Sequence, residues 1–345
     1  ITSGGLSLIL YLRTLAPGLL PGDSGELQTL SYLLGNTHPT GYSVYLLIGK
    51  VFTWLPVRDI AYRVNLLSAV MAALTVAGVY LAGRLLTKHR LPALVGALAL
   101  AVSPTFWSQA VLAEVYTPGA AFLVAVLLSL LLWDTHRRPR YLFLAGVLGG
   151  LSLGVHLTVA LLAPAVAVFS LLIWWRGQAR GQMMWRPAFL GALTGTGLML
   201  IAFLALDWNA PPANFFDSAV LPSRSSWGFK ATDLNTPFER LAFDLGGRQF
   251  HSLMFTDPPQ VMPRLARQYG DGLPKELSWW IVGLAGLGIL SLFVRRWRLA
   301  VLFLLALAVH WLYTFNYDLW DLYVFFIPGY VLLAILAGAG LGWLM

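Results

Sequence analysis

Residues 60–83 read IAYRVNLLSAVMAALTVAGVYLAG, and this stretch decides the class of fold. It is apolar apart from Arg63, Asn65 and a few small hydroxyl side chains. A transmembrane α-helix needs about 20 consecutive residues that are predominantly apolar. The stretch therefore predicts a helix that crosses a membrane, with its polar first turn at one bilayer surface.

Further stretches of similar length extend this pattern over most of the chain. They are 1–16, 91–110, 118–133, 141–157, 159–175, 187–207, 278–294, 299–315 and 323–345. Of the 345 residues, 58% are hydrophobic and 11% are charged, whereas a soluble domain carries charge on about a quarter of its positions. The runs are continuous and do not alternate as the strands of a membrane β-barrel do. The sequence predicts an all-α integral membrane protein of about ten transmembrane helices, folded as a single membrane domain over 1–345.

The chain contains no cysteine, which excludes disulfides, thiolate catalysis and Cys-ligated zinc or iron–sulfur sites. It begins at Ile1 without an initiator methionine, and its first apolar stretch is short. We therefore expect the natural chain to begin further upstream.

The net charge of +8 reflects where the basic side chains lie along the chain. They cluster in every second connection between the apolar stretches, at Arg84, Lys88 and Arg90, at Arg137, Arg138 and Arg140, at Arg176, Arg180 and Arg186, and at Arg295, Arg296 and Arg298. Because cytoplasmic loops are enriched in Lys and Arg, these connections are predicted to be cytoplasmic. Segments 17–59, 109–117, 208–277 and 316–322 are then exoplasmic. Since the positive charge is accounted for by topology, we expect no nucleic-acid partner.

The acidic side chains lie mostly in the exoplasmic segments. Of the 15 Asp and Glu residues, only Asp134 falls in a connection predicted to be cytoplasmic. We therefore expect the chemistry on the exoplasmic face. The alternative is that acids are merely tolerated there, because they contribute little to topology.

The two large exoplasmic loops, about 17–59 and about 208–277, do not resemble each other. A secondary transporter commonly has two related halves, and no such repeat is visible in the chain. The second loop is rich in proline and aromatic residues, and a long loop of this kind needs something to pack on. It is predicted to be an ordered lid.

The segment PGDSGEL, residues 21–27, is the sharpest candidate for chemistry. Asp23 and Glu26 are three residues apart, a spacing that places both carboxylates on one helix face. The same spacing suits a capping box with Asp23 as the N-cap, which many inert helices contain. Further polar and aromatic side chains follow closely, namely His38, Tyr42, Arg63 and Asn65.

Glu114, Tyr116 and His156 are candidates on the same predicted face. A carboxylate as near the hydrocarbon of the membrane as Glu114 carries a high free-energy cost unless a polar or charged group pairs with it. We expect Glu114 to orient Arg63 or to hold the acceptor, and a plain charge at a helix end is the alternative. His38 and His156 with neighbouring carboxylates could bind a divalent cation. Their spacings match no metal motif, so no metal site is predicted.

Several motifs together resemble a known family. GDSGEL at 22–27, THPTGY at 37–42 and YRVNLLSA at 62–69 look like the N-terminal membrane domain of the DUF2723 family, which includes the animal transmembrane protein 260 O-mannosyltransferases. Later pieces agree, namely AEVYT at 113–117, GVHLT at 154–158 and DLYVFFIP at 321–328. The sequence departs from the family at Thr40 and Ser43, where proline is expected. This loosens the turn but leaves His38 in place.

The resemblance implies a GT-C glycosyltransferase, a multi-span enzyme that passes a sugar from a polyprenyl-phosphate donor to an acceptor on the exoplasmic side. Asp23 matches the acidic residue that such folds carry in the first exoplasmic loop. A carboxylate within hydrogen-bond reach can accept the proton of the acceptor hydroxyl, so Asp23 is the expected general base. The expected reaction transfers mannose or another hexose to a Ser/Thr hydroxyl of an exported protein.

The other candidate residues are expected to support this reaction. Glu26 and Glu114 shape the polar pocket, and His38 and His156 contact the sugar or the acceptor. Arg63 is expected to hold the donor phosphate, since a buried arginine can donate two parallel hydrogen bonds to a phosphate group. The alternatives for the phosphate are Lys50, Arg58, Arg224, Arg240 and Arg248. The expected substrate-binding set is completed by Tyr42, Asn65 and Tyr116.

Other functions stay open. The acceptor could be a lipid or a glycan, or the protein could be a transporter or flippase of a lipid-linked solute, which should place paired charges at mid-membrane. No cofactor is expected to be required beyond the polyprenyl-phosphate sugar donor, and a divalent cation remains an alternative. We expect a multi-pass protein in contact with membrane lipid in a bacterial cytoplasmic membrane, because the chain lacks the soluble extension of longer family members.

Overall fold

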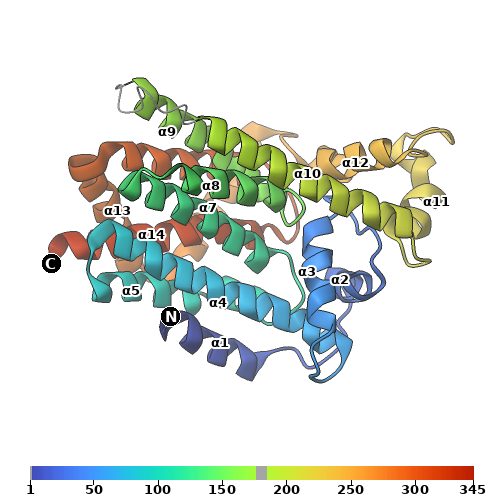
Figure 1. Ribbon diagram of the computed structural model, residues 1–345, viewed down its shortest axis with the longest axis horizontal. Coiled ribbons are helices and arrows are strands. Elements are labelled where there is room, and N and C mark those ends of the chain that lie inside the picture. Colours follow the sequence, from blue (N-terminus) through green and yellow to red (C-terminus); the bar gives the residue numbers. More distant parts are fainter. Residues whose placement is uncertain (1, 176–184) are drawn as a thin grey trace.

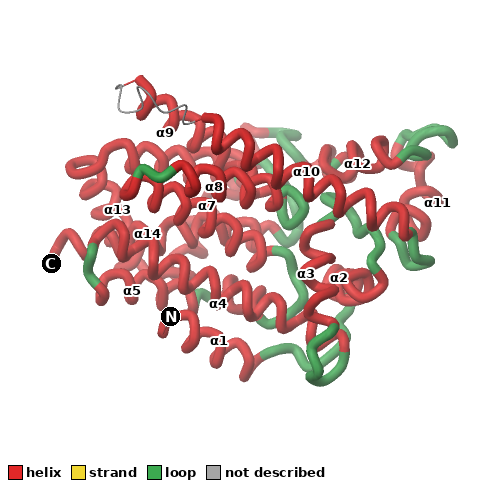
Figure 2. Tube along the Cα trace, viewed as in Figure 1, coloured by secondary structure: helices red, strands yellow, loops and turns green. Residues whose placement is uncertain are grey.

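The computed structural model describes residues 2–175 and 185–345, and its regular structure there is helical apart from one isolated β-bridge, between Met254 and Tyr317 (Figures 1 and 2). The helices are α1 (Thr2–Thr14), α2 (Gly22–Leu33), α3 (Ser43–Thr53), α4 (Ile60–Thr87), α5 (Arg90–Ala101), α6 (Pro104–Ala110), α7 (Tyr116–His136), α8 (Pro139–Ser152), η1 (Leu157–Leu162), α9 (Ala163–Trp175), α10 (Trp185–Asn209), η2 (Phe216–Val220), α11 (Leu221–Ser223), η3 (Arg224–Trp227), α12 (Pro237–Gly246), η4 (Arg248–Leu253), α13 (Pro258–Thr314), η5 (Leu322–Phe326) and α14 (Ile327–Leu344). The predicted all-α class is confirmed.

The apolar stretches of the sequence all fall on helices. Within the described residues, 6 helices are long and apolar enough to cross a membrane, and a seventh span results if α5 and α6, bent by 69° at their junction, count as one. α1 and α8 are shorter than a full span, with 13 and 14 residues. The chain is therefore a multi-pass membrane protein.

α13 differs most from the sequence prediction. Its backbone is non-helical at Ser278 and at Arg296, so it consists of three helical segments, and the last two match the predicted spans 278–294 and 299–315. The first, 258–277, was expected to be part of a loop. Prolines in the first turn of a helix break no hydrogen bond of that helix. Pro263 and Pro274 are accommodated in the helix interior. The proline content of this segment was therefore a misleading signal for a loop.

Close helix packing through small residues forms the core of the bundle. α14 is the most enclosed of the candidate spans, with 83% of its apolar window buried. A Cβ added at Gly288 of α13 would lie 2.0 Å from the carbonyl oxygen of Leu336 in α14. Only glycine allows two backbones to approach this closely, as is common between membrane helices.

The two ends of the bundle differ in character. α2, α3, α11 and α12 gather at one end (Figure 1). At the other end, Arg296 donates hydrogen bonds to the carboxylate of Asp134, at the end of α7, and to the carbonyl of Leu85, at the end of α4. Three of the four predicted cytoplasmic clusters are thereby brought together. The fourth, at 176–186, lies mostly outside the described residues.

Candidate active site

A cavity of about 210 Å³ lies where the four segments predicted to be exoplasmic meet. Its lining residues come from α2, from the α2–α3 and α6–α7 connections and the helix starts that follow them, from the 208–277 loop and from the region after α13. They are Asp23, Glu26, Leu27, His38, Tyr42, Glu114, Val115, Tyr116, Phe215, Gln249, Phe250, Tyr317, Leu319, Trp320, Asp321 and Phe325. Segments far apart in the sequence therefore share one site.

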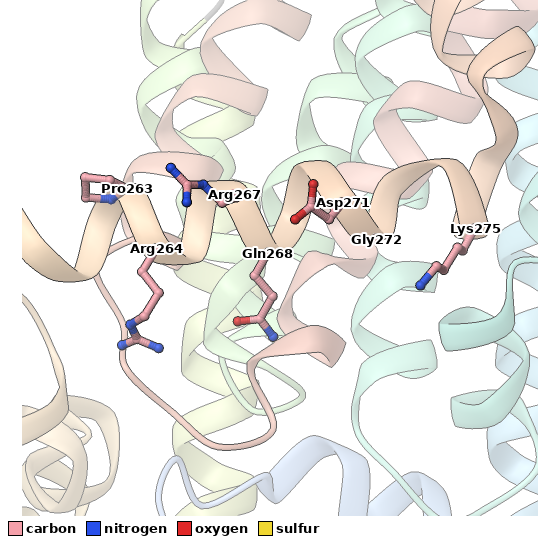
Figure 3. A pocket seen from close by; sticks show the side chains of 7 residues that line it. All are labelled: Pro263, Arg264, Arg267, Gln268, Asp271, Gly272 and Lys275. Atoms are coloured by element: carbon pink, nitrogen blue, oxygen red, sulfur yellow. The ribbon is translucent and has the colours of Figure 1, made fainter.

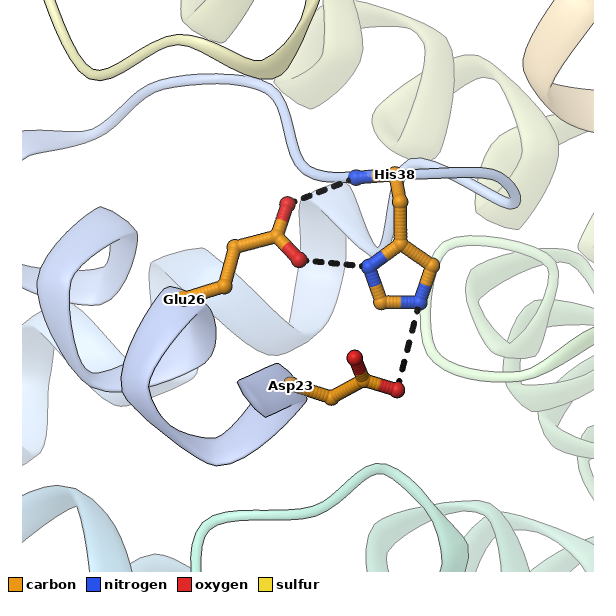
Figure 4. A group of neighbouring side chains, drawn as sticks. All are labelled: Asp23, Glu26 and His38. Atoms are coloured by element: carbon orange, nitrogen blue, oxygen red, sulfur yellow. Dashed lines mark hydrogen bonds and ion pairs between the residues drawn. The ribbon is translucent and has the colours of Figure 1, made fainter. Parts of the chain in front are cut away.

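The carboxylates of α2 face this cavity and do not cap the helix. α2 begins at Gly22, and its N-cap, Pro21, has no side-chain hydrogen bond. Glu26 instead accepts hydrogen bonds from the backbone N–H of His38, at 2.8 Å, and from His38 Nδ1, at 2.6 Å (Figure 4). The capping-box alternative for Asp23 and Glu26 is therefore wrong, and both carboxylates point toward the histidine.

The loop that carries His38 is fixed from both sides. The backbone N–H of Asn36 donates to Asn214 Oδ1 at 3.0 Å, and its side chain donates to Asp207 at 3.0 Å. Gly41 has a φ of +82°, and a Cβ there would lie 2.7 Å from Asp244 Oδ2, so glycine is required. These contacts hold the imidazole against Glu26.

His38 also faces Asp23 across the cavity mouth. Its Nε2 lies 3.9 Å from Asp23 Oδ2, and the exposed fraction is 14% for the His38 side chain and 60% for that of Asp23. Burial lowers the pKa of His38, but the hydrogen bond and charge of Glu26 and the charges of Asp23 and Glu114 together raise that pKa above its usual value. One ligand atom from each of Asp23, Glu26 and His38 lies within 4.8 Å of the others, a spacing that could hold a metal ion.

Glu114 forms another wall of the cavity. Its Oε1 accepts a hydrogen bond from Ser24 at 3.1 Å, and its backbone N–H donates to Ser68 Oγ at 3.2 Å. Burial, followed by the nearby charge of Asp23, raises the pKa of Glu114 to about 8. Glu114 is therefore largely protonated at neutral pH and can donate a hydrogen bond to an oxygen in the cavity.

A second cavity of about 400 Å³, with a mostly apolar lining, adjoins the first. Tyr42, Phe250, Tyr317 and Phe325 line both. His156 lies in this second cavity, where its Nδ1 contacts Thr158 Oγ1 at 2.5 Å. His156 is therefore near the carboxylate cluster without being part of it.

Arg63 and Asn65 do not line either cavity. The guanidinium of Arg63 donates to the backbone carbonyls of Thr53, Val57 and Arg58, at 2.6–2.7 Å. Asn65 accepts from Gln28 at 2.7 Å and donates to the loop before α2. In this structure both side chains hold the α3–α4 turn and the first loop in place, away from the site.

The other basic candidates also have their own partners. Lys50 donates to the carbonyl of Tyr32, and Arg58 lies over the ring of Tyr62. Arg240 forms a bidentate pair with Asp207, at 2.7 and 2.5 Å. The two remaining candidates are Arg224, which donates to backbone carbonyls, and Arg248, which lies over the ring of Phe229. Among the described residues that line the 210 Å³ cavity, none is Lys or Arg.

A larger open cavity, of about 630 Å³, follows one face of the first segment of α13 (Figure 3). Its polar lining includes Arg264, Arg267, Asp271 and Lys275. All of its lining residues belong to one helix, and Arg264 is paired with Asp318 at 2.6 Å. Because no second element converges on it, this surface lacks the arrangement of an active site.

The sequence did not single out Asp207 and Asp244, which support the site from α10 and α12. Asp244 is fully buried, and neither of its oxygens has a hydrogen-bond partner. Burial, followed by the charges of Asp207 and Glu26, raises the pKa of Asp244 well above its usual value. Asp207 ends a predicted apolar span and Asp244 lies in the predicted large loop, so neither position gave a signal, and only the fold brings them beside Asn36 and Gly41.

Comparison with known proteins confirms the predicted resemblance. Residues 23–179 match the family model of the protein O-mannosyl-transferase TMEM260 N-terminal domain. Protein O-mannosyl-transferase tmem260 of Dictyostelium discoideum is 27% identical over 133 residues, which are 38% of this chain and 16% of that protein. Protein O-mannosyl-transferase TMEM260 of Mus musculus is 31% identical over 121 residues, 35% of this chain and 17% of that protein. The matched part thus spans about a sixth of these relatives.

Solved structures show the same fold. ArnT from Cupriavidus metallidurans in the apo state has a TM-score of 0.62 at 14% identity, over 99% of this chain and 59% of ArnT. ArnT bound to undecaprenyl phosphate gives 0.59 at 16% identity, over the same shares. The Archaeoglobus fulgidus oligosaccharyltransferase in complex with Zn and sulfate gives 0.56 at 15% identity, over 97% of this chain and 48% of that protein. The predicted GT-C fold is confirmed.

Proposed function

We propose that the chain is the membrane domain of a glycosyltransferase that moves a hexose, mannose in the first instance, from a polyprenyl-phosphate donor to a Ser/Thr hydroxyl of an exported protein. The names of the two curated relatives support the reaction and the protein acceptor. The ArnT structure with undecaprenyl phosphate supports a polyprenyl-phosphate donor. The observation that carries the proposal is the cavity where the acidic face of α2 meets an adjoining apolar cavity.

Asp23 is the general base of this proposal. It is the most exposed of the three grouped side chains, and it lies at the cavity mouth where an acceptor hydroxyl can reach it. The hydroxyl oxygen attacks the anomeric carbon while its proton passes to the Asp23 carboxylate. The bond between the anomeric carbon and the phosphate oxygen breaks, and polyprenyl phosphate leaves with the bonding electrons.

Neighbouring residues prepare the site for this displacement. Glu26 holds His38 in one orientation through two hydrogen bonds, so the imidazole can meet the sugar or the acceptor without reorganisation. Protonated Glu114 can donate to a sugar oxygen. The apolar cavity lined by Phe250, Tyr317 and Phe325 offers room for an isoprenoid segment.

We propose that the site lies on the exoplasmic face of a bacterial cytoplasmic membrane. The segments that line the cavity are the acid-rich ones, whereas the basic clusters around Leu85, Asp134 and Arg296 meet at another place in the structure. The positive-inside rule assigns the basic place to the cytoplasm.

The test is transfer by the purified chain in detergent. Mannosyl polyprenyl phosphate labelled in the sugar is mixed with a Ser/Thr-rich peptide, and label on the peptide is measured. Transfer to peptide is the expected result. Transfer only to an added lipid or glycan would move the proposal to that acceptor class. Absence of both transfer and release of sugar, combined with uptake of donor into sealed vesicles, would favour the transporter alternative.

A further inference from the structure

The orientation of His38 leaves one ring nitrogen directed at Asp23. Glu26 accepts from Nδ1 at 2.6 Å, and this bond assigns the ring proton to Nδ1 in the neutral imidazole. Nε2 then presents a lone pair to Asp23 Oδ2 at 3.9 Å. This separation is too long for a hydrogen bond. It suits two ligands of one ion, since atoms each about 2.0–2.2 Å from a metal lie up to about 4 Å apart.

A carboxylate oxygen from another part of the fold is buried without a partner in the same cavity. Asp321 lines the cavity, and its Oδ1 is buried with no hydrogen-bond donor. A buried oxygen that has lost water without gaining a donor is costly. Asp321 belongs to the connection after α13, so this observation is independent of the α2 cluster.

The charge of the cavity calls for a cation. Asp23, Glu26, Glu114 and Asp321 bring four carboxyl groups to it, and the described lining contains no Lys or Arg. Arg264 reaches the neighbouring loop but is paired there with Asp318. These carboxyl groups outnumber the one imidazole of the lining, that of His38. A phosphate-bearing donor would be repelled by such a site.

We propose that Asp23, through Oδ2, and His38, through Nε2, bind a divalent cation, with Glu26 as the carboxylate that orients the histidine, while Oδ1 of Asp23 stays free to accept the proton of the acceptor hydroxyl. Asp321 lines the same cavity and is the candidate for a further oxygen ligand. A carboxylate holding the far nitrogen of a metal-ligating histidine is the usual partner of such ligands. One imidazole nitrogen with two or more carboxylate oxygens suits Mn²⁺, and imidazole also admits Zn²⁺.

The cation would supply the positive charge that the phosphate group needs as it leaves with the bonding electrons. This role rests on the proposed function. Binding of the ion does not, because its ligands belong to the chain alone. The two can therefore be tested separately.

The experiment measures binding of Mn²⁺ alone to the purified, metal-stripped chain, by electron paramagnetic resonance of the free ion and by calorimetry with Mn²⁺ and Zn²⁺. One saturable site per chain is expected. Asp23→Asn and His38→Gln each remove a ligand and should weaken binding by at least 10-fold. Glu26→Gln should weaken it by about 10–100-fold, as loss of an orienting carboxylate does elsewhere.

Glu239→Gln is the matched control. Glu239 is an exposed carboxylate in the capping box of α12, which glutamine can also complete, so the variant removes the same charge as Glu26→Gln and should bind Mn²⁺ as the parent does. Melting temperatures establish that each variant is folded. Should a ligand variant fail to fold, the spectrum of Mn²⁺ bound to the parent still reports whether an imidazole nitrogen is coordinated.

Absence of saturable binding of both ions, a spectrum without a coordinated nitrogen, or undiminished binding in folded Asp23→Asn and His38→Gln would overturn the site. Sugar transfer that persists in excess chelator would remove its catalytic role and leave the proposed function intact. Metal binding without any sugar transfer would sustain the site and reject the proposed function.

Discussion

At the scale of single residues, substitution of Asp23 tests catalysis with little expected effect on folding. Asp23→Asn preserves the size of the side chain, and no helix cap is lost, because Asp23 is not the N-cap of α2. Removing the proton acceptor should lower sugar transfer by about 10²–10⁴-fold. Loss of a negative charge from the first turn of α2 costs only about 0.5 kcal/mol, so the melting temperature should stay close to that of the parent.

The measurement is the transfer rate of purified Asp23→Asn beside Glu26→Gln. Glu26→Gln should lose less activity, because glutamine can still accept from the backbone N–H of His38. Full activity in a folded Asp23→Asn variant contradicts the assignment of the base. An inactive variant with a much lower melting temperature would point to a structural role.

Asp244 should make stability depend on pH. Burial raises its pKa well above the usual value of 3.8, so the unfolded state releases this proton at lower pH than the folded state does. Stability is therefore fully present below about pH 3.8 and declines as pH rises toward the raised pKa, by up to about 1.4 kcal/mol per pH unit. Asp244→Asn should flatten this decline and raise the melting temperature at pH 8.

Melting temperatures between pH 4 and pH 9 check this expectation. Asp271→Asn is the control, because Asp271 is exposed on α13 and its loss should leave the slope unchanged. A variant at position 244 whose melting temperature falls with pH as steeply as the parent's would contradict the account of a buried, protonated carboxyl group.

At the scale of elements, α12 is tied to the membrane bundle by one ion pair. Arg240 of α12 and Asp207 of α10 are bidentate, with side chains 17% and 4% exposed. Arg240→Gln leaves Asp207 buried with only the neutral hydrogen bond from Asn36, which should cost about 3 kcal/mol, the lower end of the range for breaking a buried pair. Hydrogen exchange in 237–246 should accelerate, and α12 should become accessible to protease.

Arg264→Gln provides the comparison, because the pair of Arg264 with Asp318 is about half exposed. Exposed pairs contribute about 0–1 kcal/mol, so protection of α12 should not change. Equal effects of the two substitutions would show that the Asp207 pair does not anchor the lid.

Some helices could be predicted from the sequence and others could not, depending on the sequence pattern that each helix carries. Apolar length located the spanning helices, because crossing a bilayer depends on continuous hydrophobicity alone. The helix over 258–277 was not predicted, because its prolines suggested a loop. The predicted lid supplies Phe215, Gln249 and Phe250 to the cavity, while its order and its closure over a ligand stay predictions.

The residues of the site likewise divide into those that the sequence could predict and those that only the fold brings together. Asp23, Glu26 and His38 lie within one short stretch, so spacing alone could suggest that they meet. Asp321 joins them only through the fold, and Arg63 was misjudged because sequence does not reveal that backbone carbonyls of the α3–α4 turn take up its guanidinium. Glu114 lines the cavity, in keeping with the need of an acid beside hydrocarbon for a polar surrounding, and its role toward a substrate stays a prediction.

At the scale of the whole molecule, opposite ends of the bundle should face opposite sides of the membrane. The chain has no cysteine, so single cysteines introduced at the exposed positions Arg138 and Lys230 are unambiguous labels. In intact cells an impermeant maleimide should label position 230 and spare position 138, and inverted vesicles should reverse this result. Labelling of both positions from the same side would reject the topology and with it the exoplasmic site.

The aromatic wall formed by Tyr42, Phe250, Tyr317 and Phe325 lines two cavities at once. No ring in it can shift to admit one occupant without altering the room left for the other. The apparent KM for donor should therefore vary with the concentration of acceptor, and double-reciprocal plots should intersect and not run parallel. Phe250 belongs to the predicted lid, so any movement of the lid would change the room in both cavities together.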